Sequence, residues 1–116
     1  MRIDNFAFGS IRIDGVTYEH DVVIDRGDIV KRKKKRSQRF RNKFGHTPLS
    51  PREKIPWKCK TLLVGTGNYE GLPVMKEIKR EAKRRDVKLV ILSTRRAIKV
   101  LAKKADRTNA VLHVTC

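Results

Sequence analysis

The second half of the chain alternates short apolar segments with amphipathic ones, and this alternation restricts the possible folds more than any other feature. The apolar segments are "LLV" at 62–64, "VKLVILS" at 87–93 and "AVLHVTC" at 110–116, which are typical of strands buried on both faces. Between these segments, apolar residues recur at helical spacing. We therefore expect one helix from about Pro73 to Arg85 and a second after Thr94, which we expect to cap it. The order strand–helix–strand–helix–strand predicts a parallel sheet with right-handed crossovers.

The first thirty residues follow a different period. Hydrophobic residues alternate on either side of Asp14-Gly15 and again on either side of Arg26-Gly27, and we interpret both dipeptides as hairpin turns. We therefore expect an N-terminal antiparallel meander, followed by the βαβαβ half. Together they predict one three-layer α/β domain over residues 1–116, with a mixed central sheet.

Residues 31–60 connect these halves and are rich in basic residues and proline. Nine of the thirteen residues from Lys31 to Lys43 are Lys or Arg, and beyond its first residues we expect this stretch to be exposed and poorly ordered. The motif "SPREK" at 50–54 predicts a short helix, in which Ser50 is the cap, Pro51 takes the first helical position and Glu53 completes a capping box.

The net charge points to anionic partners. The chain has 29 Lys and Arg against 12 Asp and Glu, a formal charge of +17, which favours nucleic acid first and membrane surfaces second. Two cysteines cannot form a disulfide framework, and no apolar run approaches the ~20 residues of a membrane span. The N-terminal residues also lack the hydrophobic stretch of a signal peptide, so we expect a cytoplasmic protein.

Four motifs together resemble one protein family: "FGSIRIDG.TYEHDVVI" at 8–24, "LLVGTG" at 62–67, "ST..A" at 93–97 and "LHVTC" at 112–116. The family contains small uncharacterised domains, among them archaeal and bacterial stand-alone proteins, the adipogenesis-associated Mth-domain protein and a mitochondrial complex I assembly factor. The resemblance implies a three-layer α/β fold, no established enzymatic activity and, in the mitochondrial branch, a role in protein assembly. The chain departs from the family where relatives have a Tyr-Asn pair in the last helix, since it has Val100-Leu101-Ala102 there.

A glycine-rich turn follows the first buried strand and is a candidate phosphate cradle. It lacks the Gly-Lys-Ser/Thr of a P-loop, and it matches two glycines of a dinucleotide fingerprint but has Glu70 at the third. The stretch Ser93-Thr94-Arg95-Arg96 would suit the 2′-phosphate of NADP, but no substrate domain is present and we expect no cofactor. Two interpretations stay open: the free amides of the turn bind a small anion, or the glycines only permit a tight turn. The candidate anion-binding residues are Gly65, Thr66, Gly67, Asn68, Thr94 and Arg95.

The cysteines and histidines do not predict a catalytic or metal site. His113 and Cys116 are three residues apart, so on a strand their side chains would point to opposite faces, whereas Thr115 would share the face of His113. We therefore expect Cys116 to be a packed thiol, although an enzyme using Cys116 or Cys59 is a further hypothesis. The spacing of the cysteines and histidines fits no metal site. His46 is expected to hold its loop in place by a hydrogen bond.

The basic segment is the second candidate site. Basic side chains with interleaved aromatic ones are suited to a phosphate backbone and stacked bases, although a charged run is more often a solvated surface. The candidate nucleic-acid-binding residues are Lys31, Arg32, Lys33, Lys34, Lys35, Arg36, Arg39, Phe40, Arg41 and Lys43. If this segment folds over the carboxyl edge of the sheet, the two sites become one basic pocket. We expect a non-enzymatic binding or assembly module acting on a protein partner or a small anion, with nonspecific nucleic-acid binding as the alternative.

Overall fold

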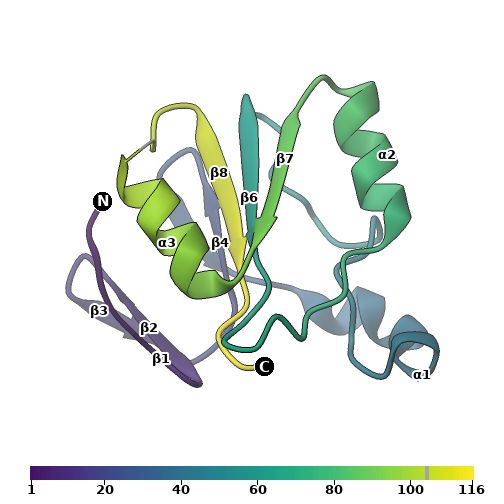
Figure 1. Ribbon diagram of the computed structural model, residues 1–116, viewed down its shortest axis with the longest axis horizontal. Coiled ribbons are helices and arrows are strands. Elements are labelled where there is room, and N and C mark those ends of the chain that lie inside the picture. The colour runs from purple at the N-terminus through teal and green to yellow at the C-terminus, as the bar shows by residue number, and fades with distance from the viewer. Residues whose placement is uncertain (104) are drawn as a thin grey trace.

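A mixed five-stranded sheet forms the centre of the protein in the computed structural model, which describes residues 1–103 and 105–116. The strand order is β5-β4-β8-β6-β7 (Figure 1). Strands β6, β7 and β8 are parallel to one another, as predicted, while β4 pairs antiparallel with both β5 and β8. The bounds are β4 (Val22–Asp25), β5 (Asp28–Lys31), β6 (Thr61–Gly65), β7 (Lys88–Leu92) and β8 (Thr108–Leu112).

The expected N-terminal meander is divided between two sheets. The strands β1 (Ile3–Ala7), β2 (Ser10–Ile13) and β3 (Val16–Tyr18) form a separate antiparallel sheet. The second hairpin, β4–β5, instead joins the central sheet through β8. The division follows from burial, because β4 is apolar on both faces and needs a layer on each side, whereas β1 and β3 are largely exposed.

Alternation along the central strands produces the predicted three layers. One face of the sheet packs against the small sheet and α3 (Thr94–Lys103), and the other packs against α2 (Lys76–Arg84) and the connection around 49–57 (Figure 1). Adjacent residues of one strand belong to different layers, as Leu62 and Leu63 do. The first face includes Val22, Ile24, Leu63, Ala110 and Leu112; the second includes Val23, Leu62, Val64 and Val111.

The basic connection is ordered, contrary to the prediction. It forms a 3₁₀ helix, η1 (Lys34–Phe40), continued by the short α1 (Arg41–Phe44), which ends at Gly45 in the left-handed conformation. Ser37 fixes η1 to the domain, because its buried hydroxyl lies 2.6 Å from Ser50 Oγ and 2.6 Å from Glu53 Oε2. The hydrogen bonds of Ser37 thus explain why this basic segment is ordered, although its charge pattern predicts disorder.

Two helix boundaries also differ from the predictions. Helix α2 begins at Lys76 instead of Pro73, because Val74 is still extended and forms a β-bridge with Leu49. Residues 50–54 form a turn and no helix, since the carboxylate of Glu53 points to Arg32 instead of back to a capping amide. In the described part of the chain, no helix combines the length and the apolar character needed to cross a membrane.

Candidate functional site

The carboxyl ends of the three parallel strands bring the predicted site segments together. Gly67 N donates to Thr94 Oγ1 at 2.8 Å, and Thr94 N donates to Gly67 O at 3.1 Å. Thr94 Oγ1 also donates to His113 O at 2.6 Å, so one buried hydroxyl joins the ends of β6, β7 and β8. The predicted proximity of the turn after β6 and the start of α3 is therefore confirmed. Thr94 was predicted to cap α3, but its side chain points inward. The capping side chain is that of Ser93, whose Oγ accepts a hydrogen bond from Arg96 N.

The glycine turn does not offer free amides, so of the two open interpretations the contacts favour the one in which the glycines only permit a tight turn. Thr66 N donates to Leu92 O, Gly67 N to Thr94 Oγ1 and Asn68 N to Thr115 O. These bonds are 2.7–2.8 Å long and leave those amides no donor for an anion.

The glycines of this turn are required by close packing. A Cβ at Gly65 would lie 2.9 Å from Thr94 Oγ1, and a Cβ at Gly67 would lie 2.3 Å from the main-chain carbon of Cys116. Gly67 also has a φ of 107°, a backbone conformation that residues with a side chain rarely adopt. The structural interpretation of the turn thus accounts for its composition. Arg95, the remaining candidate, is exposed at the start of α3 with its guanidinium 5.1 Å from the centre of the Phe6 ring.

The segment after β8 carries a chain of polar side chains. His113 Nδ1 lies 2.8 Å from Asp21 Oδ2, and His113 Nε2 lies 3.1 Å from Thr115 Oγ1. His113 and Thr115 therefore lie on one face, as the period of a strand predicts. Asp21 Oδ1 accepts from Val114 N at 2.9 Å, which ties this segment to the start of β4. Asp21 comes from a position 92 residues earlier in the chain, and the sequence analysis did not single it out.

A buried arginine completes the support of Asp21. The guanidinium of Arg32, a residue that is 3% exposed, donates to Asp21 Oδ2, to both carboxylate oxygens of Glu53 and to Pro48 O, at 2.8–3.0 Å. Burial by itself would raise the pKa of Asp21, but the hydrogen bond to His113, the charge that His113 carries when protonated, and the hydrogen bonds from the Val114 amide and Arg32 lower it to about 2. Arg32 is thus a structural ion-pair residue, and its assignment to a phosphate-contacting surface is wrong.

A hollow of about 230 Å³ lies between the η1–α1 segment and residues 113–116, and we call it the basic hollow. Figure 1 shows the C-terminal residues between this segment and the β1–β2 turn. Among its lining residues in the described chain there is no Asp or Glu side chain. The charge of Arg32 is already paired, which leaves Lys34 and Arg41 as its exposed cations. The lining residues are Arg32, Lys34, Arg41, His46, Thr47, Leu72, His113, Thr115 and Cys116.

The basic hollow contains residues of the predicted basic segment but none of the predicted anion-binding residues. It takes Lys34 and Arg41 from the basic segment, and it lies at the edge where the glycine turn was expected to bind an anion. The six predicted anion-binding residues themselves do not line it. His46 and Thr115 do line it, and no local sequence pattern indicates this because their approach depends on the fold of residues 34–47.

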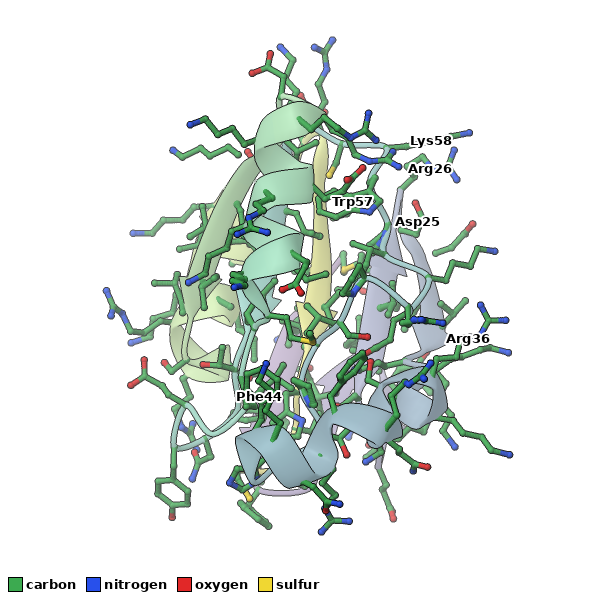
Figure 2. The ribbon with its side chains drawn as sticks, turned by 90° about the vertical axis from the view of Figure 1, so that its right-hand side faces the viewer. Asp25, Arg26, Arg36, Phe44, Trp57 and Lys58 are labelled. Carbon is green, nitrogen blue, oxygen red and sulfur yellow. The ribbon has the colours of Figure 1, made fainter. Side chains whose placement is uncertain are left out.

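Most of the basic segment outside the hollow points to solvent. Phe40 is half-buried, with Arg39 5.9 Å from the centre of its ring, and Lys43 lies 5.7 Å from the ring centre of Phe44. Figure 2 shows Arg36 extending away from the body of the molecule. The exposed basic residues are Lys31, Lys33, Lys34, Lys35, Arg36, Arg39, Arg41 and Lys43.

The cysteines lie apart from each other. Cys59 precedes the amino end of β6, and Cys116 follows the carboxyl end of β8. Burial raises the pKa of the Cys59 thiol, which makes it a weaker candidate nucleophile. Within residues 1–103 and 105–116, no group of three or more His, Cys, Asp or Glu side chains is arranged to hold a metal ion.

The fold is similar to those of several solved structures. A conserved hypothetical protein from Pyrococcus horikoshii OT3, PH1505, is 33% identical, with all of both chains covered and a TM-score of 0.85. The protein MT938 is 24% identical, with 98% of this chain and 97% of that chain covered and a TM-score of 0.69. A structure described as an outer membrane protein from Bartonella henselae is 16% identical over 98% of this chain and 94% of that one, with a TM-score of 0.65. The last two similarities show the fold alone.

The family assignment rests on nearly the whole chain. No curated protein matches it. Residues 3–113 match a family described as "Protein of unknown function (DUF498/DUF598)", and this range includes the glycine turn, the basic segment, Asp21 and His113. The chain therefore belongs to the DUF498/DUF598 family of proteins of unknown function.

Proposed function

We propose that this protein is a binding module for a small oxyanion, a phosphate or carboxylate group, that enters the basic hollow. The observation that carries the proposal is the composition of the hollow, where Lys34, Arg41, His46 and His113 converge and no acidic side chain of the described residues lines the cavity. The resemblance to a family without an established activity supports binding as the primary role.

The chemistry of these side chains suits an oxyanion. Arg41 offers a planar guanidinium that matches two oxygens of one phosphate or carboxylate, and Lys34 adds a compact charge. Hydrogen bonds to charged groups contribute roughly 1.5–3 kcal/mol each, so two of them support a Kd of millimolar order or tighter. The same contacts would hold a phosphate or carboxylate on a protein partner, which is how the assembly role implied by the resemblance would use the hollow.

The experiment is an NMR titration of the ¹⁵N-labelled protein with inorganic phosphate and with acetate, at ionic strength held constant with sodium chloride. We expect saturable amide shifts confined to residues 34–47 and 113–116. The double variant K34A/R41A should weaken the fitted affinity at least tenfold, since each lost charge contributes about 1.5 kcal/mol or more. A phosphorylated or acidic peptide, added in a parallel titration, distinguishes a protein-borne anion from a free one.

The control is the variant K76A/R80A, which removes the same two charges from the exposed surface of α2. It should leave the affinity within twofold of wild type, because neither side chain lines the basic hollow. Equal weakening in both double variants would show that only the total charge matters and would reject the basic hollow as a site.

Nonspecific nucleic-acid binding remains a second candidate function. It is supported by the net charge of +17 and by the ordered helical segment, which presents several basic side chains to solvent. Fluorescence anisotropy with a single-stranded oligonucleotide should give an affinity that falls linearly with salt on logarithmic axes. The variant K35A/R36A/R39A should make that slope shallower by about two to three units. An affinity that does not respond to salt would eliminate this candidate.

A further inference from the structure

The polar chain of Asp21, His113 and Thr115 has the connectivity of a hydrolase triad. Deprotonated Asp21 is only an acceptor, so the 2.8 Å contact requires the proton of the neutral imidazole to be on His113 Nδ1. His113 Nε2 is then the acceptor, and Thr115 Oγ1 donates to it at 3.1 Å. A hydroxyl that donates to an imidazole oriented by a buried carboxylate is the arrangement that activates serine nucleophiles, and it is recognised by geometry instead of sequence order.

The carboxylate of this chain is rigidly held. Asp21 is 8% exposed, and its oxygens accept from Val114 N and from Arg32 Nη1 as well as facing His113. Arg32, Asp21 and Glu53 together carry one net negative charge next to the ring. This negative charge faces the ring at the moment it removes the Thr115 proton and acquires positive charge. Asp21 and Arg32 are positioning residues in this arrangement.

The hydroxyl and the ring both open into the basic hollow. Thr115 and His113 line it, and the His113 side chain is 14% exposed, so a small substrate has access while most of the ring is out of water. Lys34 and Arg41 line the same hollow and supply positive charge for a developing oxyanion. The hollow is thus lined by a nucleophile, a base and cations, and the orienting carboxylate of Asp21 contacts the base from outside the lining.

We propose that Thr115 is the nucleophile and His113 the general base of an esterase activity on small carboxylic esters, with preference for esters that carry an anionic group. The preference for an anion rests on the proposed function, because it uses Lys34 and Arg41. The hydrolysis itself rests only on the contacts of Thr115, His113 and Asp21.

The reaction has two balanced steps. Thr115 Oγ attacks the ester carbonyl carbon while His113 Nε2 takes the hydroxyl proton; the C–O bond to the alcohol then breaks, and the alcohol leaves with that proton. Water next attacks the acyl-threonine, His113 takes a proton from it, and the carboxylic acid is released as Thr115 Oγ recovers a proton. The sum is ester plus water giving acid plus alcohol, and it requires no oxidant, reductant or metal.

The first experiment is covalent labelling with a fluorophosphonate, followed by peptide mass spectrometry. The hydroxyl oxygen displaces fluoride at phosphorus, so the expected product is phosphonylated Thr115. Thr115→Val should abolish this label, and Thr115→Ser should retain it. Labelling of Cys116 or of surface lysines without Thr115 would overturn the proposal.

The second experiment measures hydrolysis of 4-nitrophenyl acetate, which is neutral, and of 4-nitrophenyl hydrogen glutarate, which is anionic. Thr115→Val and His113→Gln should each lower kcat/KM by on the order of 10²-fold or more, as expected for a nucleophile and a general base. Thr115→Ser should retain activity, which separates chemistry from folding. Asp21→Asn should move the pH profile of kcat, whereas a merely structural residue would lower the rate equally at every pH. Rates unchanged by Thr115→Val would overturn the proposal.

The experiments can reject oxyanion binding and esterase activity independently of each other. Phosphate binding by the wild-type protein is measured by NMR shifts, and hydrolysis of the neutral ester does not require that binding. Thr115 labelling without phosphate shifts would reject the proposed function and retain the esterase. Phosphate shifts without labelling or hydrolysis would do the opposite.

Discussion

Replacing the buried Arg32 by methionine is expected to destabilise the fold strongly. Arg32→Met fills a similar volume but removes four hydrogen bonds, one to Asp21, two to Glu53 and one to Pro48 O. The two carboxylates then remain buried without their cation. Removing one partner of a buried ion pair costs about 3–5 kcal/mol, which is a large part of the roughly 5–15 kcal/mol that stabilises a domain.

The assay is urea unfolding followed by the fluorescence of Trp57, the chain's one tryptophan. With a slope of about 1.5 kcal/mol per molar urea, a loss of 3–5 kcal/mol lowers the unfolding midpoint by about 2–3 M at pH ~7. At pH ~4.5 the uncompensated carboxylates take up protons more readily, so the difference between variant and wild type should shrink.

The matched control is Arg84→Met, which removes an arginine that pairs with Glu81 on the exposed surface of α2. Exposed pairs contribute about 0–1 kcal/mol, so its midpoint should stay close to wild type. If Arg32→Met costs no more stability than this control, or if its deficit is the same at both pH values, Arg32 does not stabilise the fold by pairing with buried carboxylates.

Three further predictions concern stability and reactivity. Gly67→Ala should cost at least about 2 kcal/mol more than Gly27→Ala, because both glycines have positive φ but only the Gly67 Cβ would collide with Cys116; equal urea midpoints would contradict this. The pKa of Asp21, about 2 in the folded chain and 3.8 ordinarily, contributes about 2 kcal/mol that is present above pH ~4 and lost toward pH ~2; acid titration should show this loss in wild type and not in Asp21→Asn. Burial raises the pKa of Cys59, so its alkylation at neutral pH should be slow until denaturant is added, and fast labelling in the native state would refute the assignment.

The strands of the central sheet were predictable because their signals are local. Continuous apolar runs at 62–64 and 110–112 identify strands covered on both faces, and β6 and β8 are inner strands of the sheet. The same prediction for 87–93 is wrong, because β7 is an edge strand and is only partly buried. The adjacency of Gly67 and Thr94 followed from the same reasoning, since the carboxyl ends of parallel strands meet at one edge. The spacing of hydrophobic residues alone thus predicted the layers of the fold and the edge of the sheet at which the candidate site lies.

Which side chains are free to bind a ligand at that edge depends on contacts between residues that are far apart in the sequence. In the sequence, Arg32 cannot be distinguished from its exposed basic neighbours. It is buried because its guanidinium pairs with Asp21 and Glu53, which are 11 and 21 residues away in the chain. The order of η1 depends on Ser37, whose partners Ser50 and Glu53 lie in a different loop. Neither spacing nor composition carries this information. The two interpretations of the glycine turn could not be separated for the same reason, because its amides bond to segments far along the chain.

The central claim is that a small oxyanion binds in the basic hollow, and the location of a heavy oxyanion in a crystal tests it most directly. Crystals soaked in sodium tungstate or selenate would give an anomalous signal at each bound anion. We predict the strongest peak between Lys34, Arg41, His46 and Thr115, absent in K34A/R41A. A strongest peak beside the glycine turn or on α2, with the basic hollow empty, would contradict the claim.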